Sequence, residues 1–318
     1  MGVVFELLPA ARGDDPTGPA RDIATVESAR VERPPGLFGS LNAPPVHLDL
    51  SIDYLTHTPL KSFPGSFTCM RDRVTLGTWL PLPGPFFFGL DLDTEAASYS
   101  GKWGLIMGGT DQNQTLWQMS IGPKIIDRVN DTLTLYVGSV FIFAGDLDAE
   151  VQDSLRYELD LAVQLKLTSK ITLTFGAGVR TGIEARPSFY PIAAFEYGRL
   201  KIFLEGGILE TTWPLLEEAE GHHELDFVAS FGVDLRQYRL AEYSGHVLTP
   251  VPGGVLRDTR YPLVAGLRYS PFTGLRATLT GGGNLLEKLE VDDHLGRPLA
   301  RSHAIPAPCF MIRIEIDI

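Results

Sequence analysis

Residues 155–167 alternate apolar and polar side chains without interruption, and this regularity constrains the fold of the chain more than any other feature. One face carries Leu155, Tyr157, Leu159, Leu161, Val163, Leu165 and Leu167, and the other carries Arg156, Glu158, Asp160, Ala162, Gln164 and Lys166. A period of two is that of a β-strand, whose side chains point alternately to two faces. Globular strands average about 5–6 residues, whereas a tilted strand that crosses a bilayer needs about 9–11. The segment therefore favours a membrane-crossing strand.

The same alternation recurs along the chain after residue 45. It is seen in residues 46–54, 171–180, 224–231 and 310–318. Each segment presents one apolar face and one polar face, which is typical of strands in a membrane barrel. No stretch of about 18 apolar residues exists, so the sequence predicts no transmembrane helix. The mean hydropathy of +0.05 agrees, because alternating strands average out near zero.

Short and long connectors between these segments alternate. The short ones are residues 81–85, 168–170, 197–199 and 270–274, and the longer ones are residues 56–66, 145–150, 211–221 and 291–304. Outer-membrane barrels have short periplasmic turns and longer outer loops. We therefore expect residues 45–318 to form a single antiparallel, up-and-down transmembrane β-barrel with an even number of strands, about 12–14. Residues 1–44 lack periodicity and are expected to be a disordered or extended N-terminal segment.

Aromatic residues are expected to mark the two membrane interfaces. Those near predicted strand ends are Tyr54, Trp79, Phe86, Tyr99, Trp103, Tyr136, Phe189, Tyr197, Tyr261, Tyr269 and Phe310. Tyr and Trp are enriched at such interfaces, although aromatic residues also favour strands in general.

The order of these features resembles an uncharacterised family of bacterial outer-membrane barrel domains, a domain of unknown function. The resemblance rests on four sequence features: residues 127–133, the alternating residues 155–178, Tyr190-Pro191 followed by Tyr197-Gly198, and Gly281-Gly282-Gly283 leading into residues 286–289. It implies the barrel fold and lends no catalytic residues. Barrels of this class usually end in an aromatic residue, whereas this chain ends in Ile318.

The polar faces of the predicted strands supply the candidate site, which is the lining of the lumen. The expected lumen-lining residues are Asp49, Asp53, Arg156, Glu158, Asp160, Gln164, Lys166, Arg180, Glu205, Asp226, Arg268, Arg276, Arg313 and Glu315. Their charges are mixed in sign, and buried charges need partners. This favours a narrow or partly filled lumen over a wide channel.

No motif for catalysis, a cofactor or a metal stands out. His222-His223-Glu224 offers too few ligands on one strand face for a metal site. Ser302-His303 and Ser244-Gly245-His246 lack a nucleophile-elbow motif. Gly281-Gly282-Gly283 is not followed by the Lys-Ser/Thr of a phosphate loop, so a strand kink or close packing is the better interpretation. We expect no enzyme, no cofactor and no metal.

Cys69 and Cys309 leave one question of bonding open. A disulfide is possible in an oxidising compartment, but the separation of the two cysteines in sequence does not decide it. Two small apolar residues in strands are the favoured interpretation.

The function classes follow from these expectations. The first hypothesis is a porin-like or small-solute channel in the bacterial outer membrane, and the alternative is a scaffold barrel whose loops or lumen bind a partner. A membrane enzyme, or a soluble β-sandwich or closed barrel with an apolar interior, is less favoured. The formal charge of −12 argues against nucleic acid as a partner.

The expected partners are the lipid bilayer, the outer-membrane assembly machinery and a possible protein bound by the loops or the N-terminal segment. Residues 1–11 carry Glu6 and lack the basic and apolar regions of a secretory signal, so a mature form, a form cut for expression or a mis-assigned start is expected.

Overall fold

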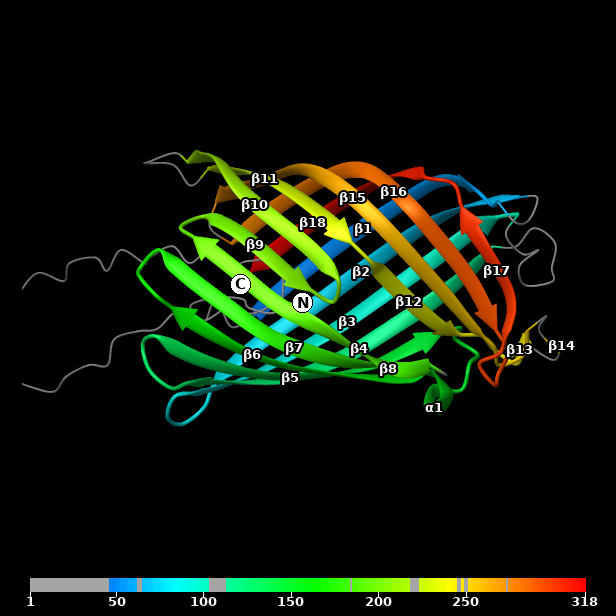
Figure 1. Ribbon diagram of the computed structural model, residues 1–318, viewed down its shortest axis with the longest axis horizontal. Coiled ribbons are helices and arrows are strands. Elements are labelled where there is room, and N and C mark those ends of the chain that lie inside the picture. The colour runs from blue at the N-terminus through cyan, green and yellow to red at the C-terminus, as the bar shows by residue number, and fades with distance from the viewer. Residues whose placement is uncertain are drawn as a thin grey trace, which may run out of the picture.

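A closed antiparallel sheet dominates the computed structural model (Figure 1). The structure describes residues 46–61, 65–102, 113–183, 185–217, 223–244, 247–248, 251–272 and 274–318. The sheet holds 16 strands, and two of them, β12 and β17, lie alongside wall strands rather than in the circuit, which leaves 14 in the barrel wall. The predicted fold class and the even strand number are confirmed.

The wall follows the chain order around the barrel. Its strands are β1 (Val46–Pro59), β2 (Ser66–Pro81), β3 (Phe86–Gly101), β4 (Gln114–Arg128), β5 (Leu133–Gly145), β6 (Leu155–Lys166), β7 (Ile171–Gly182), β8 (Ala185–Tyr197), β9 (Leu200–Glu205), β10 (Ile208–Glu217), β11 (Glu224–Gly232), β15 (Val255–Phe272), β16 (Leu275–Asp292) and β18 (Ala307–Asp317). The other elements are α1 (Val151–Ser154), β12 (Asp234–Arg239), β13 (Tyr243–Ser244), β14 (Val247–Leu248) and β17 (Pro298–Ala304). Within the described part of the chain, no helix is long and apolar enough to cross a membrane.

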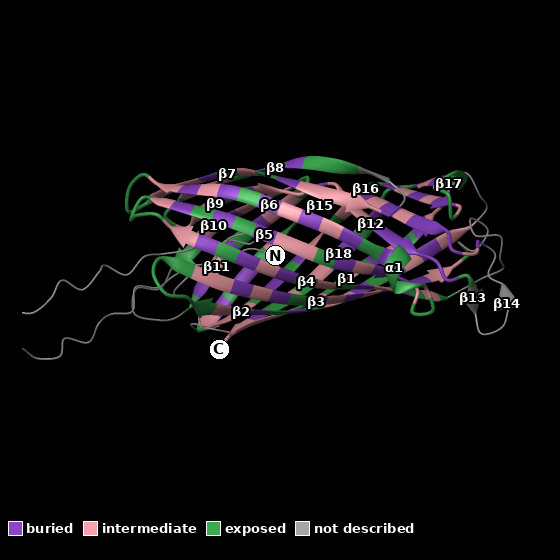
Figure 2. Cartoon of the chain, turned by 90° about the horizontal axis from the view of Figure 1, so that it is seen from below, coloured by how far each residue is buried: buried purple, intermediate pink, exposed green. Residues whose placement is uncertain are grey.

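The wall separates an apolar outside from a largely polar inside, because successive side chains of a strand point to opposite faces. On β6 the outward Leu161 is 52% exposed, whereas the inward Arg156 is 4% exposed. Figure 2 shows the same alternation of buried and exposed residues along most strands. Exposed large apolar residues on the outer face include Leu50, Ile52, Val74, Leu92, Ile125, Val137, Leu161, Phe175, Phe231, Leu267, Leu279 and Ile312.

The two terminal strands of the described chain close the barrel. β1 pairs with β18 in antiparallel register, with Leu50 opposite Ile314 and Tyr54 opposite Phe310. The N–H of Ile318 donates to the carbonyl of Val46 at 3.0 Å. Because every described wall strand has neighbours on both sides, the sheet they form has no long open edge except beside residues 185–192 of β8.

The barrel has two different ends, which we call the turn end and the loop end (Figure 1). The turn end, at the left of Figure 1, holds Val46, Asp317 and the short connectors after β2, β4, β6, β8 and β15. The loop end holds the connectors after β1, β5, β12 and β16, together with α1, β13, β14 and β17. One expectation is corrected: residues 211–217, expected in a loop, belong to β10, which ends at the turn end.

The β9–β10 hairpin is much shorter than its neighbours. Glu205 pairs with Ile208, and the turn between them consists of Gly206 and Gly207 at φ 58° and 93°. Two successive residues in the left-handed region make the tight turn that glycine permits. In Figure 1 the hairpin ends partway along the barrel, while β8 and β15 continue toward the loop end.

The aromatic residues divide between the two faces more evenly than expected. Tyr54, Phe86, Phe189, Tyr197, Tyr269 and Phe310 are exposed on the outside. Tyr99 and Tyr136 are instead buried inside the barrel, and the ring of Trp79 lies 4.6 Å from the buried Nζ of Lys124. These three residues belong to inward faces of their strands, so their expected interface role is wrong. Trp103 lies outside the described residues.

Candidate functional site: the lumen

A cavity of about 400 Å³ lies inside the barrel and is lined mainly by charged side chains. The wall strands β2 to β7 contribute many of them, and β12 contributes others. The charged lining residues are Asp53, Arg71, Arg73, Asp91, Asp93, Glu95, Lys124, Arg156, Glu158, Asp160, Arg180, Glu205, Asp234, Arg236 and Arg260. Both signs are present in similar numbers, so the cavity suits neither cations nor anions as a whole.

The expected lumen residues fall into two groups according to their position along the barrel axis. Those that line the cavity are Asp53, Arg156, Glu158, Asp160, Arg180 and Glu205. Those nearer the turn end are Asp49, Gln164, Lys166, Asp226, Arg268, Arg276, Arg313 and Glu315. All of them lie on the inward faces of their strands, and Gln164, Asp226, Arg268 and Glu315 are buried.

Ion pairs join strands and a turn in the turn-end half of the lumen. Arg313 Nε donates to Asp49 Oδ2 at 2.8 Å across the β1–β18 seam. Arg276 Nε lies 3.3 Å from Glu315 Oε2, and Arg199 Nη2 lies 2.7 Å from Asp226 Oδ1. These contacts neutralise charges that would otherwise be costly to bury.

A second group of charges crosses the lumen itself. Arg71 on β2 donates to Asp258 on β15 at 2.8 Å, and Tyr99 on β3 donates to the same carboxylate oxygen at 2.6 Å. Arg260 donates to Asp258 at 2.9 Å and to Glu287 on β16 at 3.1 Å. We name these five residues the central network. Because β2 and β3 lie four and five strands from β15 around the wall, their contact with Asp258 narrows the lumen.

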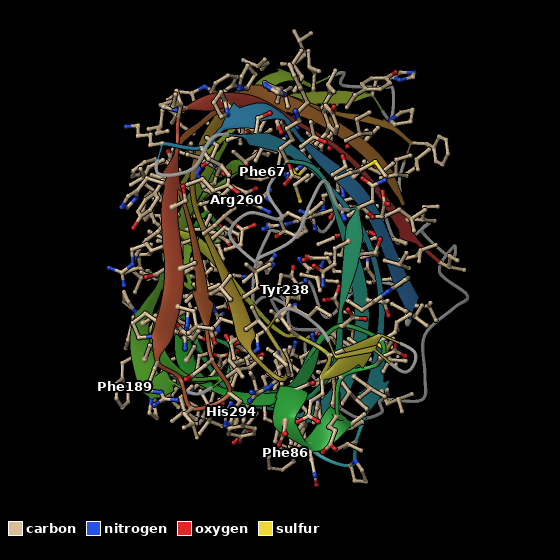
Figure 3. All side chains as sticks on the ribbon, turned by 90° about the vertical axis from the view of Figure 1, so that its right-hand side faces the viewer. Phe67, Phe86, Phe189, Tyr238, Arg260 and His294 are labelled. Carbon is tan, nitrogen blue, oxygen red and sulfur yellow. The ribbon has the colours of Figure 1, made fainter. Side chains whose placement is uncertain are left out.

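The strand β12 crosses the lumen and narrows it further. It pairs with β15 along its length, and Arg239 at its end pairs in parallel with Gly145 of β5. β5 lies seven strands from β15 in either direction around the wall, so β12 joins opposite sides of the barrel. Figure 3, which looks in from the loop end, shows Tyr238 and Arg260 inside the barrel, whereas Phe86 and Phe189 lie at its outer rim.

Side chains of β12 fix it to the facing wall. Arg236 donates to Glu95 on β3 at 3.1 and 3.2 Å, and Tyr238 donates to the same carboxylate at 3.2 Å. Arg71 also contacts Asp234. A charged pair with two parallel hydrogen bonds is a geometrically specific contact, so β12 has a defined position in the lumen.

Apolar side chains close the lumen on the loop side of the central network. The cluster includes Leu55, Phe67, Cys69, Leu116, Tyr238, Leu240, Leu256 and Leu289, all at most 3% exposed. They come from β1, β2, β4, β12, β15 and β16 and from the segment after β12. An apolar layer on the inner face of a barrel excludes water, so this end is packed rather than open.

The residues of the central network and most of those of β12 were not among the expected lumen-lining residues. Arg71, Asp258 and Glu287 were missed because a strand's polar face cannot show which of its residues meet across a barrel. The segment 234–239 does carry a signal, since Asp234, Arg236 and Arg239 leave it without a continuous apolar face. A wall strand in lipid requires such a face.

Other candidate chemistry gains little from the structure. His47, Asp49 and Glu315 have ligand atoms within 4.8 Å of one another and could hold a metal ion. His47 Nδ1 lies 2.8 Å from Asp317, however, and arginines already neutralise the two carboxylates. His222 lies outside the described residues, and His223 is exposed at the turn end beside Tyr269.

Cys69 and Cys309 are both free and buried. Each is paired in register with Leu55, one from β2 and one from β18, so the two thiols flank that residue on the inner face. The favoured interpretation of two small apolar residues in strands fits this position.

The connector after β16 is exposed, and backbone N–H groups of Arg297 and Leu295 help hold the pKa of Asp293 below its ordinary value.

The solved structures with which this chain aligns include bacterial outer-membrane proteins. An outer-membrane channel from Pseudomonas putida F1 covers 90% of this chain and all of its own, at 9% identity and a TM-score of 0.45. OccK7 from Pseudomonas aeruginosa covers 86% and 99% at 12% identity and a TM-score of 0.36. The toluene transporter TodX from Pseudomonas putida covers 86% and 89% at 10% identity and a TM-score of 0.36.

No family model and no curated protein matches the sequence. The resemblance to an uncharacterised barrel family therefore stays a prediction.

Proposed function

We propose that this chain is a small-solute channel of the bacterial outer membrane whose lumen is narrowed by β12. One observation carries the proposal: β12 leaves the wall after Gly232, joins β15 to β5 across the barrel, and borders a charged cavity of about 400 Å³. A segment that narrows the lumen beside a polar cavity limits the size of a solute that can pass. The apolar outer face supports the location in a membrane.

The proposed passage depends on movement of β12 or of the segment after it. The central network and the apolar cluster at the loop end fill the lumen in the described structure. A solute that enters from the turn end therefore meets a packed layer before it reaches the loop end. The channel would open only when this layer is displaced, which predicts a low resting conductance.

Single-channel recording in a planar lipid bilayer tests the proposal. The Tyr238→Ala variant removes the largest buried side chain of β12 and its hydrogen bond to Glu95, and it should raise the conductance above that of the wild type. Leu285→Ala serves as a control, because Leu285 is exposed on β16 and its removal should leave the conductance unchanged. A wild type and a Tyr238→Ala variant that are both silent after verified insertion would contradict a channel.

A scaffold barrel without transport is the second candidate. The packed lumen favours it, and so do exposed apolar residues at the loop end, in α1, β17 and the connectors, namely Leu147, Val151, Leu295, Leu299 and Ile305. Exposed apolar groups gathered at one end are a feature of partner-binding surfaces. Silent recordings would favour this candidate if the chain also retained a protein partner. The Leu295→Ser and Leu299→Ser variants should then lose that partner.

A further inference from the structure

The barrel wall has a bounded opening beside β8, which we call the window. Residues Ala193 to Tyr197 of β8 pair with β9, but among the described residues no wall strand lies beside residues 185–192 on that side. The short β9–β10 hairpin limits the window toward the turn end, because its turn lies at Gly206-Gly207. The window therefore exists because the hairpin stops before its neighbours do.

The window has fixed borders toward the loop end and on the far side. The side-chain oxygen of Gln237 on β12 accepts the N–H of Ile183 at 2.8 Å, and Arg257 on β15 donates to the carbonyl of Ile183 at 3.1 Å. The N–H of Val233 donates to the carbonyl of Gly207 at 3.1 Å. These contacts tie the ends of the neighbouring segments to one another. They leave the edge of β8 at residues 185–192 without a strand partner in the described part of the chain.

Two prolines adapt the free edge of β8. Tyr197 and Leu200 flank the two-residue turn into β9, so the odd-numbered residues of β8 direct their backbone groups toward the β9 side. Pro187 and Pro191 share this parity. Proline has no N–H to donate, and it is found in sheets where that side of the strand is unpaired. The missing donors lower the cost of leaving this edge open.

The window joins the cavity to the apolar exterior. Its borders Gly206, Ile208, Val233 and Leu235 line the cavity. On the outside, Phe189 is 82% exposed, and its side chain lies at the outer rim in Figure 3. A solute that moved through the window would pass directly between the lumen and the surroundings of the barrel.

The cavity also holds one buried cation whose charge is not matched by a carboxylate. Arg156 is 4% exposed and lines the cavity, and its Nη2 donates to Gln118 at 2.7 Å. Within the described residues its Nε has no hydrogen-bond partner, and no carboxylate forms an ion pair with it. A buried polar group without a partner is costly, and a ligand anion would satisfy it.

The neighbouring carboxylate is already engaged. Glu158 receives two hydrogen bonds from Arg180, both at 2.8 Å, and a further contact from Tyr190 on β8. This leaves Arg156 as the cation that is available to a ligand, on a strand two positions from the window edge.

We propose that the lumen binds a small amphipathic anion, with its charged group on Arg156 and its apolar part toward the window, and that such molecules exchange with the bilayer through the window. The proposal rests on the membrane location proposed above. The ligand class follows from the chemistry of the site: a buried guanidinium at one place, apolar side chains around the window, and a volume suited to a short chain.

Binding of [1-¹³C]octanoate to the full chain in lipid nanodiscs tests the anion subsite. A charge-assisted hydrogen bond contributes to the binding free energy, and Arg156→Gln should therefore weaken octanoate binding about tenfold or more. The affinity for [1-¹³C]octanol should be the same for both proteins. Arg297→Gln, which changes an exposed arginine at the loop end, is the matched control and should bind octanoate like the wild type. Equal octanoate affinity in the wild type and Arg156→Gln would overturn the subsite.

Closing the window tests the route. Two β-forming residues inserted on each side of Gly206-Gly207, with Pro191→Val, extend the hairpin along the free edge of β8. The exchange of octanoate between bilayer and bound resonances should slow several-fold, whereas the same insertion in the connector 293–297 should leave it unchanged. Ile208→Trp is a second obstruction for the case in which the insertion prevents folding. Unchanged exchange in both obstructed proteins would place the route at an end of the barrel and overturn the window.

The channel and the window fail in distinguishable ways. Ion conductance through the barrel axis should be the same with the window open or closed. A protein that conducts but does not bind octanoate would contradict the further inference alone, and one that binds octanoate without conducting would contradict the channel alone.

Discussion

Arg313 and Asp49 form an ion pair across the seam where the last strand of the described chain meets the first, with Nε 2.8 Å from Oδ2. The two residues are 264 positions apart in sequence. Their contact occurs because β1 and β18 pair antiparallel with the polar faces of both strands turned inward. The predicted closure through the termini is therefore present in the structure.

The register of this seam predicts a specific cross-link. Leu50 and Ile314 are direct partners, so cysteines at both positions should form a disulfide without unfolding the protein. Cys69 and Cys309 are replaced by serine in this background to avoid exchange. The pair Leu50→Cys with Ile312→Cys, which is displaced by two residues, is the control and should react poorly. Mass spectrometry of the oxidised protein reads out the bond, and equal yields for the two pairs would contradict the register.

Removal of residues 310–318 should abolish folding. These residues supply nearly all of the register of β18 with β1 and most of that with β16. Without them two strands are left with open edges, and unpaired backbone groups are not tolerated in lipid. Loss of the heat-modifiable gel mobility of a folded barrel is the measurement. A truncated chain that still assembles would show that the seam is dispensable.

A charged residue on the outward face of β6, midway along the strand, should destabilise the barrel. Leu161→Arg should destabilise the barrel by about 2–4 kcal/mol, because an arginine at the bilayer midplane costs that much. Gln164→Arg should cost far less, since Gln164 faces the lumen beside Thr134 and Thr174. Reversible unfolding in urea with lipid vesicles compares the two. Equal losses would show that the face assignment is wrong.

The central network should be sensitive to the loss of its shared carboxylate. Asp258→Ala leaves Arg71 and Arg260 buried with one partner fewer, and breaking a buried pair in this way typically costs about 3–5 kcal/mol. Arg297→Ala removes an exposed ion pair instead and should not shift the unfolding midpoint measurably. A midpoint for Asp258→Ala that equals that of the wild type would mean that water replaces the carboxylate without loss.

Much of the architecture could be predicted from local pattern. The alternation in residues 155–167 determined which side chains of β6 face outward and which face inward, and the same regularity in residues 46–54 and 310–318 predicted the seam. The prediction succeeded because the side-chain period of a strand is fixed at two. Once the apolar face of a strand is known to point outward, the remaining side chains must point inward. Leu161 and Arg156 lie on the sides that this rule predicts.

The aromatic residues show where local pattern fails. Position near a strand end did not distinguish Tyr99, which is buried and bound to Asp258, from Tyr54, which is exposed. The difference lies in parity relative to the apolar face, and near strand ends that parity is hard to read. Irregular pairing adds to this, as in the shift between Leu55 and Thr58 on β1.

By itself the sequence determined a barrel, the facing of its strands and the presence of mixed charge inside. Tertiary structure alone decided that β12 crosses the lumen, that Arg71 meets Asp258, and that a window lies beside β8. The reason is that alternation encodes the direction of a side chain from its own strand, whereas these features depend on which strands face one another across a closed circuit. That circuit is set by the number of strands, their register and the length of one hairpin, and none of these is a property of a single segment.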